Sequence, residues 1–166
     1  NLTVDDTGAL EFTIAARLEA CIKQAVDTDK EFLLDMLEEN KYHTEKEIFR
    51  FSRLYLPGNS PKMMLNAGIH KPNGIILDLE DSVAPTKKHE ARFNIRNALR
   101  SLDFYGAERM VRINQLPDGI EDIKYVAPHY VNLLLVPKCE SADQILAVEQ
   151  EIEKQRKIHG FEYPIW

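Results

Sequence analysis

Short apolar runs alternate with amphipathic stretches along residues 51–166. Apolar runs bounded by turn residues predict strands, whereas apolar residues spaced three and four apart predict helices. We expect strands at 53–57, 74–80, 109–114 and 131–137, with a fifth beginning at 163. Helices are expected between them, and strict alternation predicts a parallel sheet with right-handed crossovers. The fold is then α/β, either a doubly wound sheet or a (β/α)8 barrel.

Three helices have clear sequence signals. One begins at Ser60-Pro61, where a capping residue precedes a proline at the first helical position. A second buries apolar residues within 91–102, and a third begins at Ser141 with Gln144 completing a capping box. These helices fit the crossovers that a parallel sheet requires.

Alternation within the strands favours the barrel. Ile75, Leu77 and Leu79 share one face, whereas Asp78 and Glu80 lie on the other with Ile76. Strands 109–114 and 53–57 alternate in the same way. Central strands of a doubly wound sheet are apolar on both faces, but barrel strands can become polar toward their carboxyl ends, where a barrel's active site lies.

Residues 1–50 have a different character. They carry 12 acids and 6 bases, which accounts for the whole net charge of −6 in the 166-residue chain. Apolar residues from Leu10 to Ala25 recur at helical spacing, and Thr28 with Glu31 predicts a second helix cap. Thr44 with Glu47 is a candidate cap for a third, short helix. We interpret this segment as a scaffold.

The composition sets broad limits on function. The two cysteines, Cys21 and Cys139, have neither metal-ligand nor redox spacing, so a reducing cytoplasm is expected. No apolar run approaches the ~20 residues that span a bilayer. The acidic balance argues against nucleic acid as a partner.

A cluster of charges is expected at the carboxyl ends of the strands. Glu80 and Asp78 would meet basic and amide side chains there, namely Arg53, Arg112, Asn114 and Lys138. Such a rim suits an anionic substrate with a cation, and it equally suits a structural ion pair of Glu80 with Arg112 or Arg53. The pattern alone leaves both interpretations open.

Four motifs resemble one family. RLYLPGNSPKMM, GIILDLEDSVAPTKKHEAR, VRINQL and LLLVPKCESADQI occur in the order and spacing of the citrate lyase β-subunit group of HpcH/HpaI aldolases. The stretch LTVDDTGALEFTIAARLEA resembles the end of the citrate lyase γ-subunit, an acyl carrier protein. This predicts a carrier-like fragment at 1–27, an acidic helical linker at 28–50 and the N-terminal half of a lyase barrel at 51–166.

The resemblance implies retro-Claisen cleavage of a citryl or other 3-hydroxy-acyl thioester, giving oxaloacetate and an acetyl thioester. It assigns substrate binding to Arg112, a carboxylate clamp, and Asn114, and a supporting role to the acids Asp78, Glu80 and Asp81. Contacts with the thioester, carried on CoA or phosphoribosyl-dephospho-CoA, fall to a further set of residues: Pro57, Gly58, Asn59 and Lys138.

The resemblance also implies Mg²⁺, whose ligands in this family follow strands five and six and so are expected after Trp166. Both ends then look truncated, and the chain alone is expected to be inactive. Partner subunits of the citrate lyase type and homo-oligomers are expected. Alternatives are a malyl- or citramalyl-CoA lyase-like enzyme and a non-catalytic carrier or assembly subunit.

Overall fold

The structure is a computed structural model that describes residues 36–166. Its sheet contains four parallel strands in the order β1-β2-β3-β4, the order of the sequence. The strands are β1 Arg53–Pro57, β2 Gly74–Asp78, β3 Glu108–Arg112 and β4 Leu133–Leu135. The α-helices are α2 Pro61–Leu65, α3 Lys88–Ser101, α4 Gly119–Val126 and α5 Ala142–His159. Short 3-10 turns are η1 Glu38–Asn40, η2 Gly68–His70, η3 Pro85–Lys87 and η4 Ala127–His129. The predicted α/β class and parallel sheet are confirmed.

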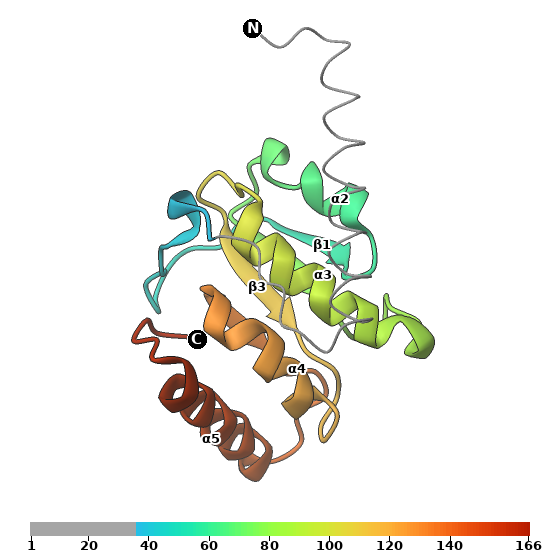
Figure 1. Ribbon diagram of the computed structural model, residues 1–166, viewed down its shortest axis with the longest axis vertical. Helices are drawn as coiled ribbons and strands as arrows, with labels where there is room; N and C mark the ends of the chain where they lie inside the picture. The colour runs from blue at the N-terminus through green and yellow to red at the C-terminus, as the bar shows by residue number, and fades with distance from the viewer. Residues whose placement is uncertain (1–35) are drawn as a thin grey trace, which may run out of the picture.

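Helices cover one face of the sheet in the described part of the chain. In Figure 1, α3 and α4 lie side by side in front of the strands, and α5 follows α4. The core between these layers contains Ile75, Leu77 and Leu79 of one strand and Val111 and Ile113 of the next. The predicted alternation of faces is therefore confirmed, and Asp78 and Arg112 lie on the face away from the helices.

The strands β2, β3 and β4 end two residues earlier than predicted, and at β2 and β3 side chains take over the backbone partners. At the end of β2, Asp78 accepts hydrogen bonds from the backbone N–H groups of Glu80 and Ser82 at 2.9 and 3.1 Å. Such a bond from an aspartate to the backbone two residues on turns the chain. At the end of β3, the N–H of Asn114 donates to Asp122 at 2.7 Å instead of to a neighbouring strand.

The helices form largely where the sequence predicts them. At the start of α5, Gln144 accepts hydrogen bonds from the backbone of Glu140 and Ser141, as the capping box predicts. Gly160 ends this helix in the left-handed conformation at φ 70°. The eight-residue helix α4 had no individual prediction, although it buries Ile123 and Val126 in the core.

The helix predicted from Thr44 and Glu47 is wrong. Residues 41–50 contain no helix, because the Thr44 hydroxyl donates to Glu108 at 2.7 Å rather than capping a helix. We call residues 37–50 the strap. It lies along the amino end of the sheet, to the left in Figure 1. The described part of the predicted helical linker thus has one 3-10 turn and no α-helix, while the carrier-like stretch 1–27 lies outside the described residues.

The predicted fifth strand is present only as backbone pairing. The N–H of Trp166 donates to the carbonyl of Asn132 at 3.0 Å, and the N–H of Leu134 donates to the carbonyl of Trp166 at 2.7 Å. These two bonds place Trp166 beside β4, but residues 163–166 form no assigned strand.

Candidate functional site

The register of the sheet brings Asp78 and Arg112 together. The two residues are partners on adjacent parallel strands and close the carboxyl ends of β2 and β3. Arg112 donates from Nε and Nη2 to the two carboxylate oxygens of Asp78, each at 2.7 Å. This bidentate geometry is the strongest that an arginine and a carboxylate adopt.

Asp78 is held by more than the arginine. Its carboxylate also accepts from the Ser82 hydroxyl at 2.5 Å and from the two backbone N–H groups that end β2. Burial alone would raise the pKa of Asp78, but the hydrogen bonds from Arg112 and Ser82 outweigh it and lower that pKa to about 2. Asp78 is therefore ionised at neutral pH and holds Arg112 in one orientation.

Glu80 links Arg112 to Lys138. Its Oε2 lies 3.0 Å from Nη1 of Arg112, and its Oε1 accepts from Lys138 Nζ at 3.1 Å and from Gln115 Nε2 at 3.0 Å. Lys138 also lies 3.8 Å from Asp81. Burial would raise the pKa of Glu80, but hydrogen bonds from Gln115 and Lys138 lower it overall.

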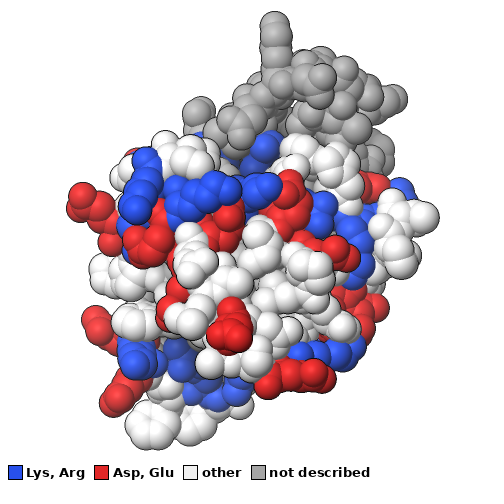
Figure 2. Space-filling view, turned by 90° about the horizontal axis from the view of Figure 1, so that it is seen from below, with Lys and Arg blue, Asp and Glu red and all other residues white. Residues whose placement is uncertain are grey.

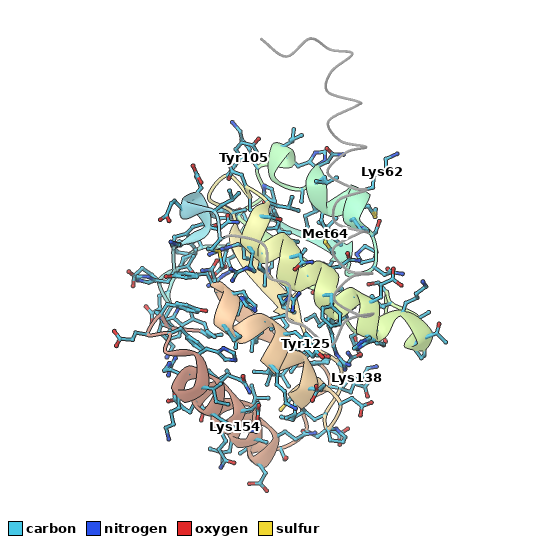
Figure 3. All side chains as sticks on the ribbon, in the orientation of Figure 1. Lys62, Met64, Tyr105, Tyr125, Lys138 and Lys154 are labelled. Carbon is cyan, nitrogen blue, oxygen red and sulfur yellow. The ribbon has the colours of Figure 1, made fainter. Side chains whose placement is uncertain are left out.

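Lys138 reaches this cluster from the loop after β4. It adopts a left-handed conformation at φ 48° and lies on the side toward which the β3 arrow points (Figures 1 and 3). Its hydrogen bond with Glu80 raises the pKa of the lysine. We call Asp78, Glu80, Arg112 and Lys138 the rim cluster.

One end of the Arg112 guanidinium faces solvent. Asp78 occupies Nε and one side of Nη2, so the remaining N–H groups point away from that carboxylate. The Arg112 side chain is 24% exposed, and its guanidinium lies 5.4 Å from the ring of Tyr55, which is itself exposed. An anion that approaches from solvent therefore meets a fixed guanidinium, with Glu80 as its competitor.

Arg53 is not part of the rim cluster, so its predicted place there is wrong. It begins β1 and pairs in register with Gly74, the first residue of β2. The strands are parallel, and Arg53 therefore lies at the amino end of the sheet, opposite the cluster. The structural ion pair considered for Glu80 involves Arg112, not Arg53.

Asn114 is also directed away from the rim cluster. Its Nδ2 donates to Asp122 of α4 at 2.8 Å, and its backbone N–H donates to the same oxygen. Asp122 is in turn paired with Arg92 at 2.7 Å. This arrangement ties the end of β3 to α3 and α4.

The loop after β1 approaches β2 closely. Pro57 ends β1, and the N–H of the next residue, Gly58, donates to the Asp78 carbonyl at 2.8 Å. A Cβ at Gly58 would lie 2.7 Å from that carbonyl oxygen and 2.8 Å from Ile95, so only glycine fits there. Asn59 follows at the turn, partly buried. These residues support the backbone of Asp78.

Sequence reasoning missed four residues at this site: Tyr55, Ser82, Lys88 and Gln115. Gln115 and Lys88 stand inside quoted motifs, and only the folded chain shows that they contact Glu80. Alternation predicts Tyr55 on the same face as Arg112, which was the available signal.

The described residues do not form a magnesium site. No group of three or more His, Cys, Asp or Glu side chains within residues 36–166 is arranged to hold a metal ion. The carboxylates of Asp78 and Glu80 are already taken by hydrogen bonds and ion pairs with protein groups. Mg²⁺ prefers several free oxygen ligands in octahedral geometry, which these two acids do not offer.

The surface gives two further observations. Basic and acidic side chains lie side by side on the face shown in Figure 2, without one extended positive field over its described residues. None of the helices within residues 36–166 is sufficiently long and apolar to cross a membrane.

Residues 52–162 match the family described as HpcH/HpaI aldolase/citrate lyase. The chain belongs to this family. It is 36% identical over 115 residues to the citrate lyase subunit beta of Haemophilus influenzae, covering 68% of this chain and 40% of that protein. It is also 36% identical over 104 residues to human mitochondrial citramalyl-CoA lyase, covering 60% of this chain and 31% of the relative.

A solved structure is similar as well. The citrate lyase beta subunit of Mycobacterium tuberculosis, complexed with oxaloacetate and magnesium, is 32% identical, with a TM-score of 0.48 over 57% of this chain and 41% of that one. The chain spans about two fifths of the length of the citrate lyase relatives that it matches.

Proposed function

We propose that this protein acts in a carbon–carbon lyase of the citrate lyase type, which cleaves a citryl thioester to oxaloacetate and an acetyl thioester. The observation that carries the proposal is Arg112, which Asp78 fixes on one side and which is partly exposed on the other, where Glu80 is its ion-pair partner. A guanidinium held in this way is suited to bind a substrate carboxylate. Membership of the lyase family supports the same reaction class.

The proposed reaction is a retro-Claisen cleavage. A base takes the proton of the substrate hydroxyl, and the carbon–carbon bond beside it breaks as the C–O bond becomes a carbonyl. The bond's electron pair moves into the thioester as an enolate, and protonation of that enolate gives the acetyl thioester. Arg112 would hold a carboxylate of the oxaloacetate portion and so fix the orientation of the breaking bond.

Glu80 and Lys138 would control how accessible Arg112 is to a substrate carboxylate. In the structure, Glu80 faces Arg112 and Lys138 at 3.0 and 3.1 Å. An incoming carboxylate would displace Glu80 from Arg112, and Lys138 would retain it. Contacts with the thioester end remain proposed for Pro57, Gly58, Asn59 and Lys138, and Asp81 remains a proposed supporting acid. No step is assigned to a metal, because the described residues form no site for one.

We further propose the larger setting that the resemblance implies. The one-sided helix layer and sequential parallel strands support a (β/α)8 barrel of which residues 51–166 are one half. The proposed substrate is carried on CoA or phosphoribosyl-dephospho-CoA, and partner subunits deliver it in a complex in the cytoplasm. Magnesium, which the family resemblance implies, is proposed to bind through residues other than 36–166.

Substitution of Arg112 tests the proposal. Arg112→Lys keeps the charge but loses the fork that binds a carboxylate at two points. In the full-length lyase with magnesium, we expect kcat/KM for citryl-CoA, followed as oxaloacetate release, to fall about 100-fold or more, which is about 3 kcal/mol of transition-state stabilisation. The melting temperature should change little. Arg53→Lys, the same change at the opposite end of the sheet, is the matched control and should leave kcat/KM within about twofold.

Three outcomes would contradict or change the proposal. An Arg112→Lys variant that melts early but keeps its activity per folded molecule would show that the rim cluster is a structural ion pair. A wild-type protein that cleaves malyl-CoA or citramalyl-CoA instead of citryl-CoA would keep the reaction class and change the substrate, as the citramalyl-CoA lyase relative makes reasonable. No cleavage of any of the three would support a non-catalytic subunit.

A further inference from the structure

Lys88 holds the turn that carries Glu80. It is the first residue of α3, ten residues after the end of β2, and its side chain reaches back to that turn. Its Nζ donates to the backbone carbonyls of Leu79 and Glu80, at 2.6 and 2.5 Å. One ammonium group therefore joins the amino end of α3 to both residues at the point where the chain leaves the sheet.

Other bonds also hold the turn, including those from the N–H groups of Glu80 and Ser82 to the Asp78 carboxylate. The N–H of Leu79 donates to the Arg112 carbonyl at 2.9 Å, and the N–H of Val83 donates to the Glu80 carbonyl at a longer 3.3 Å. Leu79 and Glu80 are buried, with 0% and 4% of their surfaces exposed. A buried carbonyl that loses its donor pays the full cost of desolvation, so these residues would move to regain a partner.

Movement there would reach Arg112. Glu80 contacts the solvent-side end of the Arg112 guanidinium through Oε2, while Lys138 and Gln115 hold its other oxygen. How firmly Glu80 holds Arg112 depends on where its backbone lies, because a shift of about 1 Å would lengthen one of these contacts beyond hydrogen-bond distance. Misplacement of that size is known to reduce catalysis about 100-fold.

We propose that Lys88 is a positioning residue that fixes Glu80 between Lys138 and Arg112, and thereby sets how readily a substrate carboxylate gains access to Arg112. The inference rests on the proposed lyase function for its kinetic consequence, but the positioning itself is a property of the described residues. Lys88 touches neither Arg112 nor the proposed substrate, and acts through Glu80 alone.

The adjacent lysine provides a matched control. Lys87 pairs with Glu90 at 2.6 Å and is 54% exposed, and within the described residues its side chain makes no hydrogen bond to the turn. Lys87→Met and Lys88→Met remove the same charge and the same ammonium group one residue apart. A difference between the two variants therefore reports the two carbonyl contacts and not the net charge.

The first measurement is kinetic. With citryl-CoA, Lys88→Met should lower kcat/KM about 10- to 100-fold, mostly through kcat, whereas Lys87→Met should stay within about twofold of wild type. Lys88→Arg retains donors for both carbonyls and should recover most of the loss. Should Lys88→Met not fold, Lys88→Gln, which keeps one donor, replaces it and should give an intermediate loss.

The second measurement does not depend on activity. Carbon-13 NMR of the Glu80 carboxyl, assigned with Glu80→Gln, follows its titration in each variant. Hydrogen bonds from Gln115 and Lys138 lower the pKa of this carboxyl in the wild type. If Lys88→Met moves Glu80 away from these donors, that pKa should rise toward the ordinary glutamate range. A purely structural role for Lys88 would lower the melting temperature and leave the titration of Glu80 unchanged.

The outcomes separate the two proposals. If the full-length protein with magnesium cleaves none of the three thioesters, the proposed function fails, while a shifted Glu80 titration still supports positioning by Lys88. If the wild type is active but Lys88→Met matches Lys87→Met in both kcat/KM and the Glu80 titration, the positioning role is wrong.

Discussion

The two ends of the parallel sheet each hold a buried carboxylate against an arginine, on the face away from the helices. At the carboxyl end, Asp78 binds Arg112 of the neighbouring strand. At the amino end, Glu108 begins β3 and binds Arg50 of the strap through Nε and through Nη2, the latter at 2.7 Å. The carboxylate side chains of both pairs are 1% exposed.

The ends differ in what surrounds each pair. At the amino end the strap supplies the remaining partners, since the Thr44 hydroxyl donates to Glu108 and the Tyr42 carbonyl accepts from Arg109 and Asn132. At the carboxyl end, loops supply partners on one side only, and Lys138 is 58% exposed. The same kind of ion pair is therefore enclosed by the chain at the amino end, which we call the closed end. At the carboxyl end, which we call the open end, a ligand can compete for the arginine.

The largest expected loss of stability comes from removing the Glu108 carboxylate at the amino end of the sheet. Glu108→Ala leaves the Arg50 guanidinium, only 17% exposed, without its carboxylate. Removing one partner of a buried pair costs about 3–5 kcal/mol, and we expect a loss of that size in the free energy of unfolding measured by urea denaturation. Glu90→Ala, which removes an exposed pair with Lys87, is the control and should cost under about 1 kcal/mol.

This prediction also tests the separation of the two ends. Lyase activity per folded Glu108→Ala molecule should stay near that of wild type, because Glu108 lies at the opposite end of the strand from Arg112. A variant that is stable but inactive would show that the amino end belongs to the functional site.

A smaller effect, with a defined pH dependence, is expected at the open end. The pKa of Asp78 falls from 3.8 to about 2 on folding, which stabilises the folded state by about 2 kcal/mol at pH 7. Because the folded-state value is the lower one, this stabilisation is present above about pH 4 and is lost as the pH falls toward 2. Asp78→Asn should therefore be about 2 kcal/mol less stable at pH 7.

The difference in unfolding free energy between Asp78→Asn and wild type should decrease as the pH falls. Urea denaturation from pH 7 to pH 2 measures this, and Asp81→Asn, at an exposed neighbouring acid, should change stability by under about 0.5 kcal/mol throughout. A difference between Asp78→Asn and wild type that does not vary with pH would mean that packing, not charge, accounts for the role of Asp78.

The open end was more accessible to sequence reasoning than the closed end. Period-two alternation places Asp78 and Arg112 on one face, because side-chain direction in a strand depends only on parity. The partner of Arg112 was harder to choose, since Asp78 and Glu80 have the same parity. The register that sets Asp78 beside Arg112 comes from strand pairing and is not encoded locally.

The closed end had no such signal. Its contacts join residues about 60 to 90 positions apart, such as Tyr42 with Asn132 and Thr44 with Glu108. Thr44 fits a helix-cap pattern, but its hydroxyl donates to the buried Glu108 carboxylate instead. A tertiary contact therefore outweighs the local preference. The prediction for Arg53 is wrong for a different reason, because parity in a strand gives the face of a side chain but not the end of the sheet at which it lies.

The smallest effect expected is the loss of the Tyr42 hydroxyl, whose contact is separate from that of the Tyr42 ring. The hydroxyl donates to the buried Ala107 carbonyl at 2.5 Å, while the ring lies 4.1 Å from the guanidinium of Arg109. Burial lowers the pKa of Arg109, and its Nε and Nη1 have no hydrogen-bond partner within the described residues, so the ring is a main source of stabilisation for that charge. Tyr42→Phe keeps the ring and should cost about 1 kcal/mol of unfolding free energy.

Tyr42→Leu removes the ring as well and should cost about 1–2 kcal/mol more, because a desolvated cation then loses the face of an aromatic group. Urea denaturation of the two variants separates these contributions, and kcat/KM for citryl-CoA in each should equal that of wild type. Equal losses in Phe and Leu variants would assign the whole contribution to the hydroxyl. A loss of kcat/KM per folded molecule would show that contacts of the strap affect Arg112. The distinction between a structural amino end and a binding carboxyl end would then be wrong.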